Sequence, residues 1–131
     1  MLAEQSAPTS DDGTKAWLDG ARRVVRSVLA QCPAPAAVGV AAPGLPSSDQ
    51  RSIAFMPGRL PGLEGLNWQE WLELDSPVPV FNDAQAALLG EVWIGAAKGA
   101  ANVVLLTLGT GVGGAAMVDG DRKSTRLNSS H

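Results

Sequence analysis

The sequence predicts an α/β fold, because short apolar runs alternate with segments of helical periodicity. Residues 37–42 form a continuous apolar run that Pro43 and Gly44 end, which is typical of a buried strand followed by a turn. Residues 102–108 form a second, clearer strand pattern. Residues 15–31 carry apolar side chains at i, i+3/i+4 and i+7, which predicts an amphipathic helix.

Composition narrows the class of protein. The chain has 131 residues, 45% hydrophobic and 18% charged, within the range of one globular domain. A net charge of −3 argues against a nucleic-acid partner. The single cysteine, Cys32, fits a reducing compartment. We find neither a signal peptide nor an apolar run near the roughly 20 residues that cross a bilayer. We therefore expect a cytoplasmic protein without nucleic-acid or membrane partners.

Local capping patterns predict further elements. Asp11 and Asp12 precede the first helix and are expected to cap it. Residues 51–56 alternate and predict a strand. Asn67 with Glu70 predicts the N-terminus of a short helix. Its tryptophans, Trp68 and Trp71, suit core packing better than stacking on a sugar, because they lie at helical spacing.

Gly44 and the pair Asn82-Asp83 follow two predicted strands. Ligands collect at the carboxyl ends of strands in open α/β sheets, so Gly44 either lets backbone approach a substrate or is a plain turn glycine. Asp83 begins a helix predicted over residues 84–98, where a negative charge is favoured. A carboxylate there suits the acceptance of a hydroxyl proton in phosphoryl transfer, with Asn82 bonding neighbouring hydroxyls. The alternative is a simple helix cap.

Residues 109–114 read Gly-Thr-Gly-Val-Gly-Gly, between two apolar runs. Backbone N–H groups and the Thr110 hydroxyl of such a turn can point at phosphate oxygens, and missing β-carbons allow close approach. A dinucleotide-binding turn requires a helix afterwards, whereas residues 115–118 look like a strand. A tight hairpin without a ligand also fits. Downstream, Asp119-Gly120 predicts another hairpin turn.

Residues 38–120 resemble the ROK family of sugar kinases and related sugar-sensing repressors, within the actin/hexokinase-like (ribonuclease H-like) fold. The matching pieces are residues 38–44, 60–65 and 106–114, and Asn82-Asp83-Ala84 with Glu91. The resemblance implies Asp83 as the general base toward a sugar hydroxyl and Asn82 as a sugar contact. It also implies ATP and Mg²⁺, with the second phosphate loop of the ATP site formed by Gly109, Thr110, Gly111, Gly113 and Gly114.

The differences between this sequence and the usual family pattern predict that the chain is a fragment of a longer protein. Residues 1–101 are expected to form a partial N-terminal lobe lacking its first strands, and residues 102–120 the first hairpin of the C-terminal lobe. Residues 121–131 resemble a translated sequencing adapter. Arg59 stands where the family usually has Asn, and the family's zinc motif is absent. We therefore predict that the chain is a fragment of a hexose or N-acylhexosamine kinase and that this fragment is inactive by itself. Whether the full-length parent protein is a homodimer stays open. The alternatives are a repressor fragment and a dinucleotide-binding domain.

Overall fold

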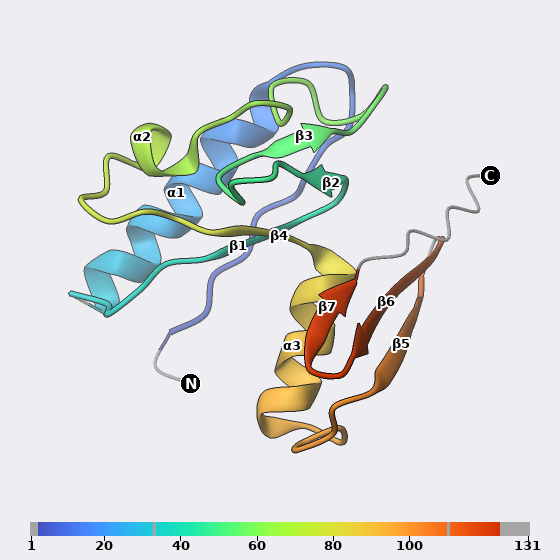
Figure 1. The fold of residues 1–131 in the computed structure, drawn as a ribbon. Helices are drawn as coiled ribbons and strands as arrows, with labels where there is room; N and C mark the ends of the chain where they lie inside the picture. Colours follow the sequence, from blue (N-terminus) through green and yellow to red (C-terminus); the bar gives the residue numbers. More distant parts are fainter. Residues whose placement is uncertain (1–2, 33, 110, 124–131) are drawn as a thin grey trace. The chain divides into compact units, whose positions relative to one another are not determined.

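The computed structural model describes residues 3–32, 34–109 and 111–123 (Figure 1). The chain divides into two compact units, Met1–Val80 and Phe81–His131. Each unit has its own hydrophobic core and combines helix with strand, which confirms the predicted α/β class. The expected division of a larger protein into lobes near residue 101 stays a prediction.

The first unit packs helix α1 with several short strands (Figure 1). Strand β2 pairs with β3 in antiparallel fashion, and β1 pairs with β4. The strands expected over residues 37–42 and 51–56 are present but shorter than predicted. The elements are α1 (Ala16–Gln31), β1 (Val40–Ala42), β2 (Leu45–Pro46), β3 (Ile53–Phe55), α2 (Trp68–Leu72) and β4 (Val80–Asn82), which contains the boundary between the units.

The core of the first unit joins both helices to the strands. Trp17 of α1 and Trp68 of α2 are 8% and 6% exposed, with ring centroids 6.5 Å apart. Trp71 meets the Trp68 ring edge-on at 5.6 Å, and the Arg22 guanidinium lies 4.5 Å from the Trp71 ring centroid. These contacts confirm core packing for both tryptophans of α2. The most deeply buried side chains are Ile53, Leu63, Val78 and Val80.

The start of α1 differs from the prediction. Lys15 occupies the N-cap position without a side-chain capping bond. The Asp12 carboxylate instead accepts from the N–H and hydroxyl of Thr14, at 2.9 and 2.6 Å. Asp11 bonds to a distant loop. The expectation that these aspartates cap α1 was wrong, because a local Asp–Thr turn and a long-range contact compete successfully for their oxygens.

Helix α2 begins where the capping pattern of Asn67 and Glu70 predicts. Asn67 Oδ1 accepts the Glu70 N–H at 3.3 Å, as the capping pattern predicts. The helix ends at Leu72 because Glu73 turns left-handed, with φ of +58°. This conformation closes a helix by directing the next N–H groups back to the last carbonyls.

In the second unit, helix α3 lies along one face of a three-stranded antiparallel sheet of order β5-β6-β7 (Figure 1). Ala84 and Leu88 of α3 pack with Ala115 and Met117 of β6, and all four side chains are buried. The pattern of burial alternates along β5, as expected for one covered face. The elements are α3 (Asp83–Ile94), β5 (Val103–Leu108), β6 (Val112–Val118) and β7 (Asp121–Lys123).

Helix α3 ends earlier than predicted. The sequence favoured a helix to Lys98, but the last helical residue is Ile94. Gly95 takes an extended conformation, with φ of −101° and ψ of −155°. Its N–H still donates to the Glu91 carbonyl at 3.0 Å, and the Glu91 carboxylate accepts the Ala96 N–H at 2.8 Å. A side chain thus takes over the capping of this terminus.

The glycine turn leads into a strand, β6, rather than a helix. This contradicts the dinucleotide-binding alternative, which requires a helix at that point. Asp119 and Gly120 both have positive φ, +51° and +76°, and join β6 to β7 as the hairpin signal predicted. Residues 121–123 pair as a strand, while the rest of the expected adapter-like tail, residues 124–131, lies outside the described residues.

Within the described parts of the chain, none of the helices has the length and apolar character needed to cross a bilayer.

Candidate functional site

The N-terminus of α3 presents Asn82 and Asp83. Asn82 Oδ1 accepts the Ala84 N–H at 3.0 Å, and the Asn82 N–H donates to Gln85 Oε1 at 3.2 Å. Asp83 Oδ1 also accepts the Ala84 N–H, at 2.9 Å. The Asp83 side chain is exposed, and Asn82 is half-buried. A carboxylate is therefore held against the positive end of a helix while staying accessible to a substrate.

We expect Asn82→Ala to destabilise the second unit by about 1 kcal/mol, because α3 loses its N-cap acceptor. Asn82→Asp keeps an oxygen at the same position and should leave stability within about 0.5 kcal/mol. Urea unfolding followed by circular dichroism measures both. Equal losses in the two variants would show that the cap is not what Asn82 contributes to stability.

The glycine hairpin lies in the same unit as Asp83. Strands β5 and β6 pair as far as Leu108 and Val112, and the Gly109 N–H donates to the Gly111 carbonyl at 3.0 Å. Both turn glycines are exposed, and a β-carbon on Gly109 would meet no atom within 4 Å. Open space beside the backbone is what close approach of a phosphate needs. Thr110, the predicted hydroxyl donor, lies outside the described residues.

Gly113 joins the hairpin to the start of α3. It pairs with Thr107, and a β-carbon on it would lie 2.5 Å from Thr107 Oγ1 and 3.8 Å from Ala84 Cβ. Since Ala84 follows Asp83 directly, the structure brings the predicted base and the predicted phosphate turn to one end of α3. The remaining turn glycine, Gly114, pairs with Leu106 in the ladder.

Gly44, the other predicted substrate residue, lies in the first unit. Its φ is +104°, and a β-carbon would lie 2.7 Å from Ile53 Cγ2 and 2.8 Å from the Phe55 carbonyl oxygen. Packing against β3 and backbone conformation thus each require glycine here. The turn alternative accounts for the residue type, and a substrate contact stays a prediction.

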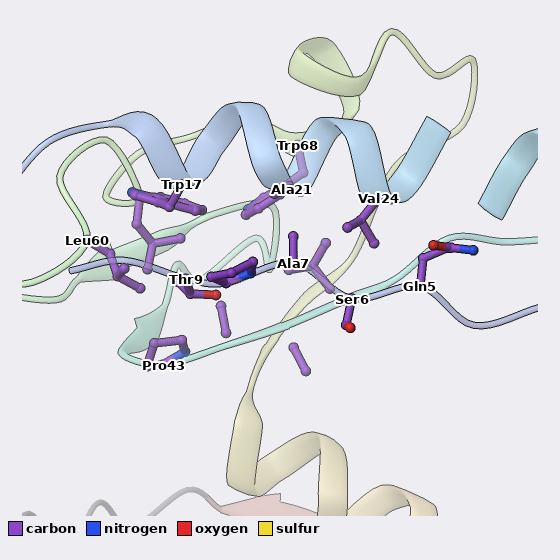
Figure 2. A pocket seen from close by; sticks show the side chains of 15 residues that line it. Gln5, Ser6, Ala7, Thr9, Trp17, Ala21, Val24, Pro43, Leu60 and Trp68 are labelled. Carbon is purple, nitrogen blue, oxygen red and sulfur yellow. The ribbon is translucent and has the colours of Figure 1, made fainter. Parts of the chain in front are cut away.

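A cavity of about 360 Å³ lies beneath α1 in the first unit (Figure 2). Figure 2 shows Trp17 and Val24 reaching from α1 toward the segment that carries Ala7. Trp68 lines the same cavity, and its buried Nε1 has no hydrogen-bond partner among the described residues. None of the predicted site residues lines this cavity.

The described residues contain no group of three or more His, Cys, Asp or Glu side chains that could hold a metal ion. The open backbone at Gly109 fits a phosphate group.

Comparison with solved structures identifies the fold as the actin/hexokinase-like fold of sugar kinases. The inorganic polyphosphate/ATP-glucomannokinase from Arthrobacter sp. strain KM superposes with a TM-score of 0.71 at 31% identity, covering 91% of this chain and 49% of that chain. The ROK glucokinase from Streptomyces griseus, solved with glucose and AMPPNP, has a TM-score of 0.66 at 28% identity, covering 82% and 36%.

The chain belongs to the ROK family, whose family model matches residues 1–124. This confirms the resemblance predicted from the motifs. The beta-glucoside kinase of Listeria monocytogenes serovar 1/2a is 35% identical over 86 residues, which is 64% of this chain and 29% of that enzyme. The chain therefore spans less than a third of the length of this curated relative.

The sequence did not predict that Asp11 and Trp17 bond to the loop of residues 59–61 in the first unit. Asp11 contacts Arg59 and Leu60, and Trp17 contacts Pro61. The sequence carries no signal for these pairs, because partners this far apart along the chain show no periodicity.

Proposed function

We propose that this chain is part of an ATP-dependent kinase that phosphorylates a hydroxyl of a glucose-like hexose or an N-acylhexosamine. The observation that carries the proposal is the exposed carboxylate of Asp83 at the N-terminus of α3. Gly113 of the glycine hairpin lies next to the same end of this helix. Membership of a family with sugar-kinase relatives supports it. A cytoplasmic location follows from the use of ATP.

In the proposed reaction Asp83 accepts the proton of the attacking sugar hydroxyl and orients its oxygen toward the phosphorus. Asn82 and Gly44 contact the sugar. The glycine turn of Gly109, Gly111, Gly113 and Gly114 lies against the phosphates, and its N–H groups that are not bonded within the hairpin, with the Thr110 hydroxyl, hold phosphate oxygens. Mg²⁺ bound with ATP would neutralise charge on the phosphates. The bond from the γ-phosphorus to the bridging oxygen breaks as the new phosphorus–oxygen bond forms, and ADP leaves.

The decisive experiment is a coupled ADP-forming assay on the complete protein that contains this chain, with glucose, a β-glucoside and N-acetylmannosamine as acceptors. We expect sugar-dependent ADP formation with at least one of them. The 131-residue chain alone is expected to be inactive, since it spans only 29% of a curated relative. Turnover of glucose by the chain alone would contradict that expectation, and absence of turnover by the complete protein with every acceptor would contradict the kinase.

A sugar-sensing repressor is the second candidate. A ROK-family transcriptional regulator, described as a homolog of the E. coli MLC protein, superposes with a TM-score of 0.63 at 25% identity. Such a protein would place a helix-turn-helix unit beside the sugar-binding part. Sugar-dependent binding to an operator without ADP formation would favour this candidate.

A further inference from the structure

Thr107 interrupts an otherwise apolar face of the second unit. Side chains alternate along a strand, so Thr107 shares one face of β5 with Val103 and Leu105, which pack with the buried residues of α3. The β6 residues paired with these three positions are Met117, Ala115 and Gly113. Thr107 is thus the polar side chain on the α3-facing side of these two strands, and it lies at the end next to the glycine turn.

The Thr107 hydroxyl occupies the space that a side chain at position 113 would need. A β-carbon on Gly113 would lie 2.5 Å from Thr107 Oγ1, but at ordinary contact distances of 3.9 Å from Thr107 Cβ and 3.8 Å from Ala84 Cβ. Gly113 is not among the glycines with positive φ, so its backbone conformation does not require glycine. The missing side chain at Gly113 therefore makes room for the hydroxyl of Thr107.

The same hydroxyl is available to a ligand. Thr107 is half-buried, and its hydroxyl has no hydrogen-bond partner among the described residues. A hydroxyl withdrawn from water is costly unless it forms a hydrogen bond. Through Gly113 it lies near Ala84, the residue after Asp83. A donor thus stands between the glycine turn and the first turn of α3.

We propose that Thr107 Oγ1 donates a hydrogen bond to the γ-phosphoryl group of a bound nucleotide. This contact rests on the proposed kinase function, in which the group passes from a nucleotide at the glycine turn to the hydroxyl beside Asp83. A group in transit between these two places reaches the Thr107 hydroxyl. Thr107 keeps its proton throughout and binds an oxygen on which negative charge is spread during transfer. Hydrogen bonds to charged acceptors are stronger than neutral ones.

A double-mutant cycle tests where the hydroxyl lies. Gly113→Ala should lower the urea midpoint of the second unit, because its β-carbon meets Thr107 Oγ1. In a Thr107→Ala background the same change should lower the midpoint by less than about half as much, since the close atom is gone. Circular dichroism follows both transitions. Equal shifts in the two backgrounds would overturn the placement of the hydroxyl and with it the contact.

Calorimetric binding of two nucleotides to the complete protein tests the contact itself. Thr107→Val removes the hydroxyl and keeps the branched shape, so it should weaken binding of the ATP analogue AMPPNP about tenfold. Binding of ADP, which lacks the γ-phosphoryl group, should change by less than about twofold. Thr107→Ser retains a hydroxyl and should bind AMPPNP within about threefold of wild type. A purely structural role of Thr107 would weaken both nucleotides alike.

Thr14→Val is the matched control, because it removes a hydroxyl from an exposed turn of the first unit, where Thr14 Oγ1 donates to Asp12. It should change neither affinity. Equal weakening of AMPPNP and ADP by Thr107→Val, or unchanged AMPPNP binding, would overturn the contact even where the wild-type protein phosphorylates sugar. Selective weakening of AMPPNP without sugar turnover by the wild type would contradict the kinase and leave the contact. Binding of neither nucleotide by the wild type would overturn both.

Discussion

Replacing Asp83 with Asn is expected to lower kcat for phosphoryl transfer by the complete protein about 10²- to 10⁴-fold, the range for losing a general base. The variant keeps an oxygen that can accept the Ala84 N–H, so α3 should remain capped. An amide cannot take up the hydroxyl proton, whereas it can still occupy the space beside the sugar. We therefore expect the sugar KM to change far less than kcat.

The control for this variant is Asp119→Asn in the same unit. Asp119 is an exposed carboxylate with φ of +51°, a conformation that Asn tolerates well. Asp119→Asn makes the same change of charge in the hairpin turn between β6 and β7, where the Asp119 N–H donates to Asn102 Oδ1. Equal losses of kcat in both variants, or a kcat for Asp83→Asn within threefold of wild type, would remove Asp83 from the reaction.

Gly44→Ala is expected to destabilise the first unit by about 3 kcal/mol or more. An added β-carbon would lie 2.7 Å from Ile53 Cγ2 and 2.8 Å from the Phe55 carbonyl oxygen, and Ile53 is fully buried. Overpacking of a filled core costs about 1–3 kcal/mol. The φ of +104° adds strain of about 1–3 kcal/mol for any residue with a β-carbon.

Gly58→Ala is the matched control, because Gly58 also has positive φ, +72°, but open space where a β-carbon would stand. It should cost about 1–2 kcal/mol from backbone conformation alone. Urea unfolding followed by tryptophan emission reports the first unit well, since Trp17 and Trp68 lie in its core. Similar losses for both glycines would show that packing against β3 is not what requires Gly44.

Several elements were predictable because their determinants are local. Asn82 and Asn67 act as caps through bonds to residues two or three positions away, and Asp119-Gly120 makes its turn through its own backbone angles. The strand after the glycine turn was predicted from its apolar character, and this correctly disfavoured the dinucleotide-binding alternative. Asp83 at the start of a helix was likewise predictable, though its chemical role is not tested by its position.

Other predictions failed where local patterns compete with distant partners. The helical propensity of residues 95–98 lost to an extended Gly95 and to the Glu91 carboxylate, which accepts the Ala96 N–H. Asp11 resembled a helix cap but bonds residues far along the chain. The apolar pattern of residues 102–108 predicted strand β5 but not which of its faces is covered. Val104, Leu106 and Leu108 on one face are 59–82% exposed in the described structure.

Sequence alone was enough to predict the α/β class, the strand–glycine turn–strand hairpin and the carboxylate at the start of α3. These depend on periodicity, capping or backbone freedom, which act within a few residues. The family was predicted from the resemblance of its motifs. Three relations became visible only in the folded chain: Gly113 lies next to Ala84, Gly44 must lack a side chain because of Ile53, and Asp11 accepts the Leu60 N–H. Those relations arise when a compact chain brings distant residues into contact, so steric exclusion and hydrogen-bond partners are set by packing rather than by neighbours in sequence.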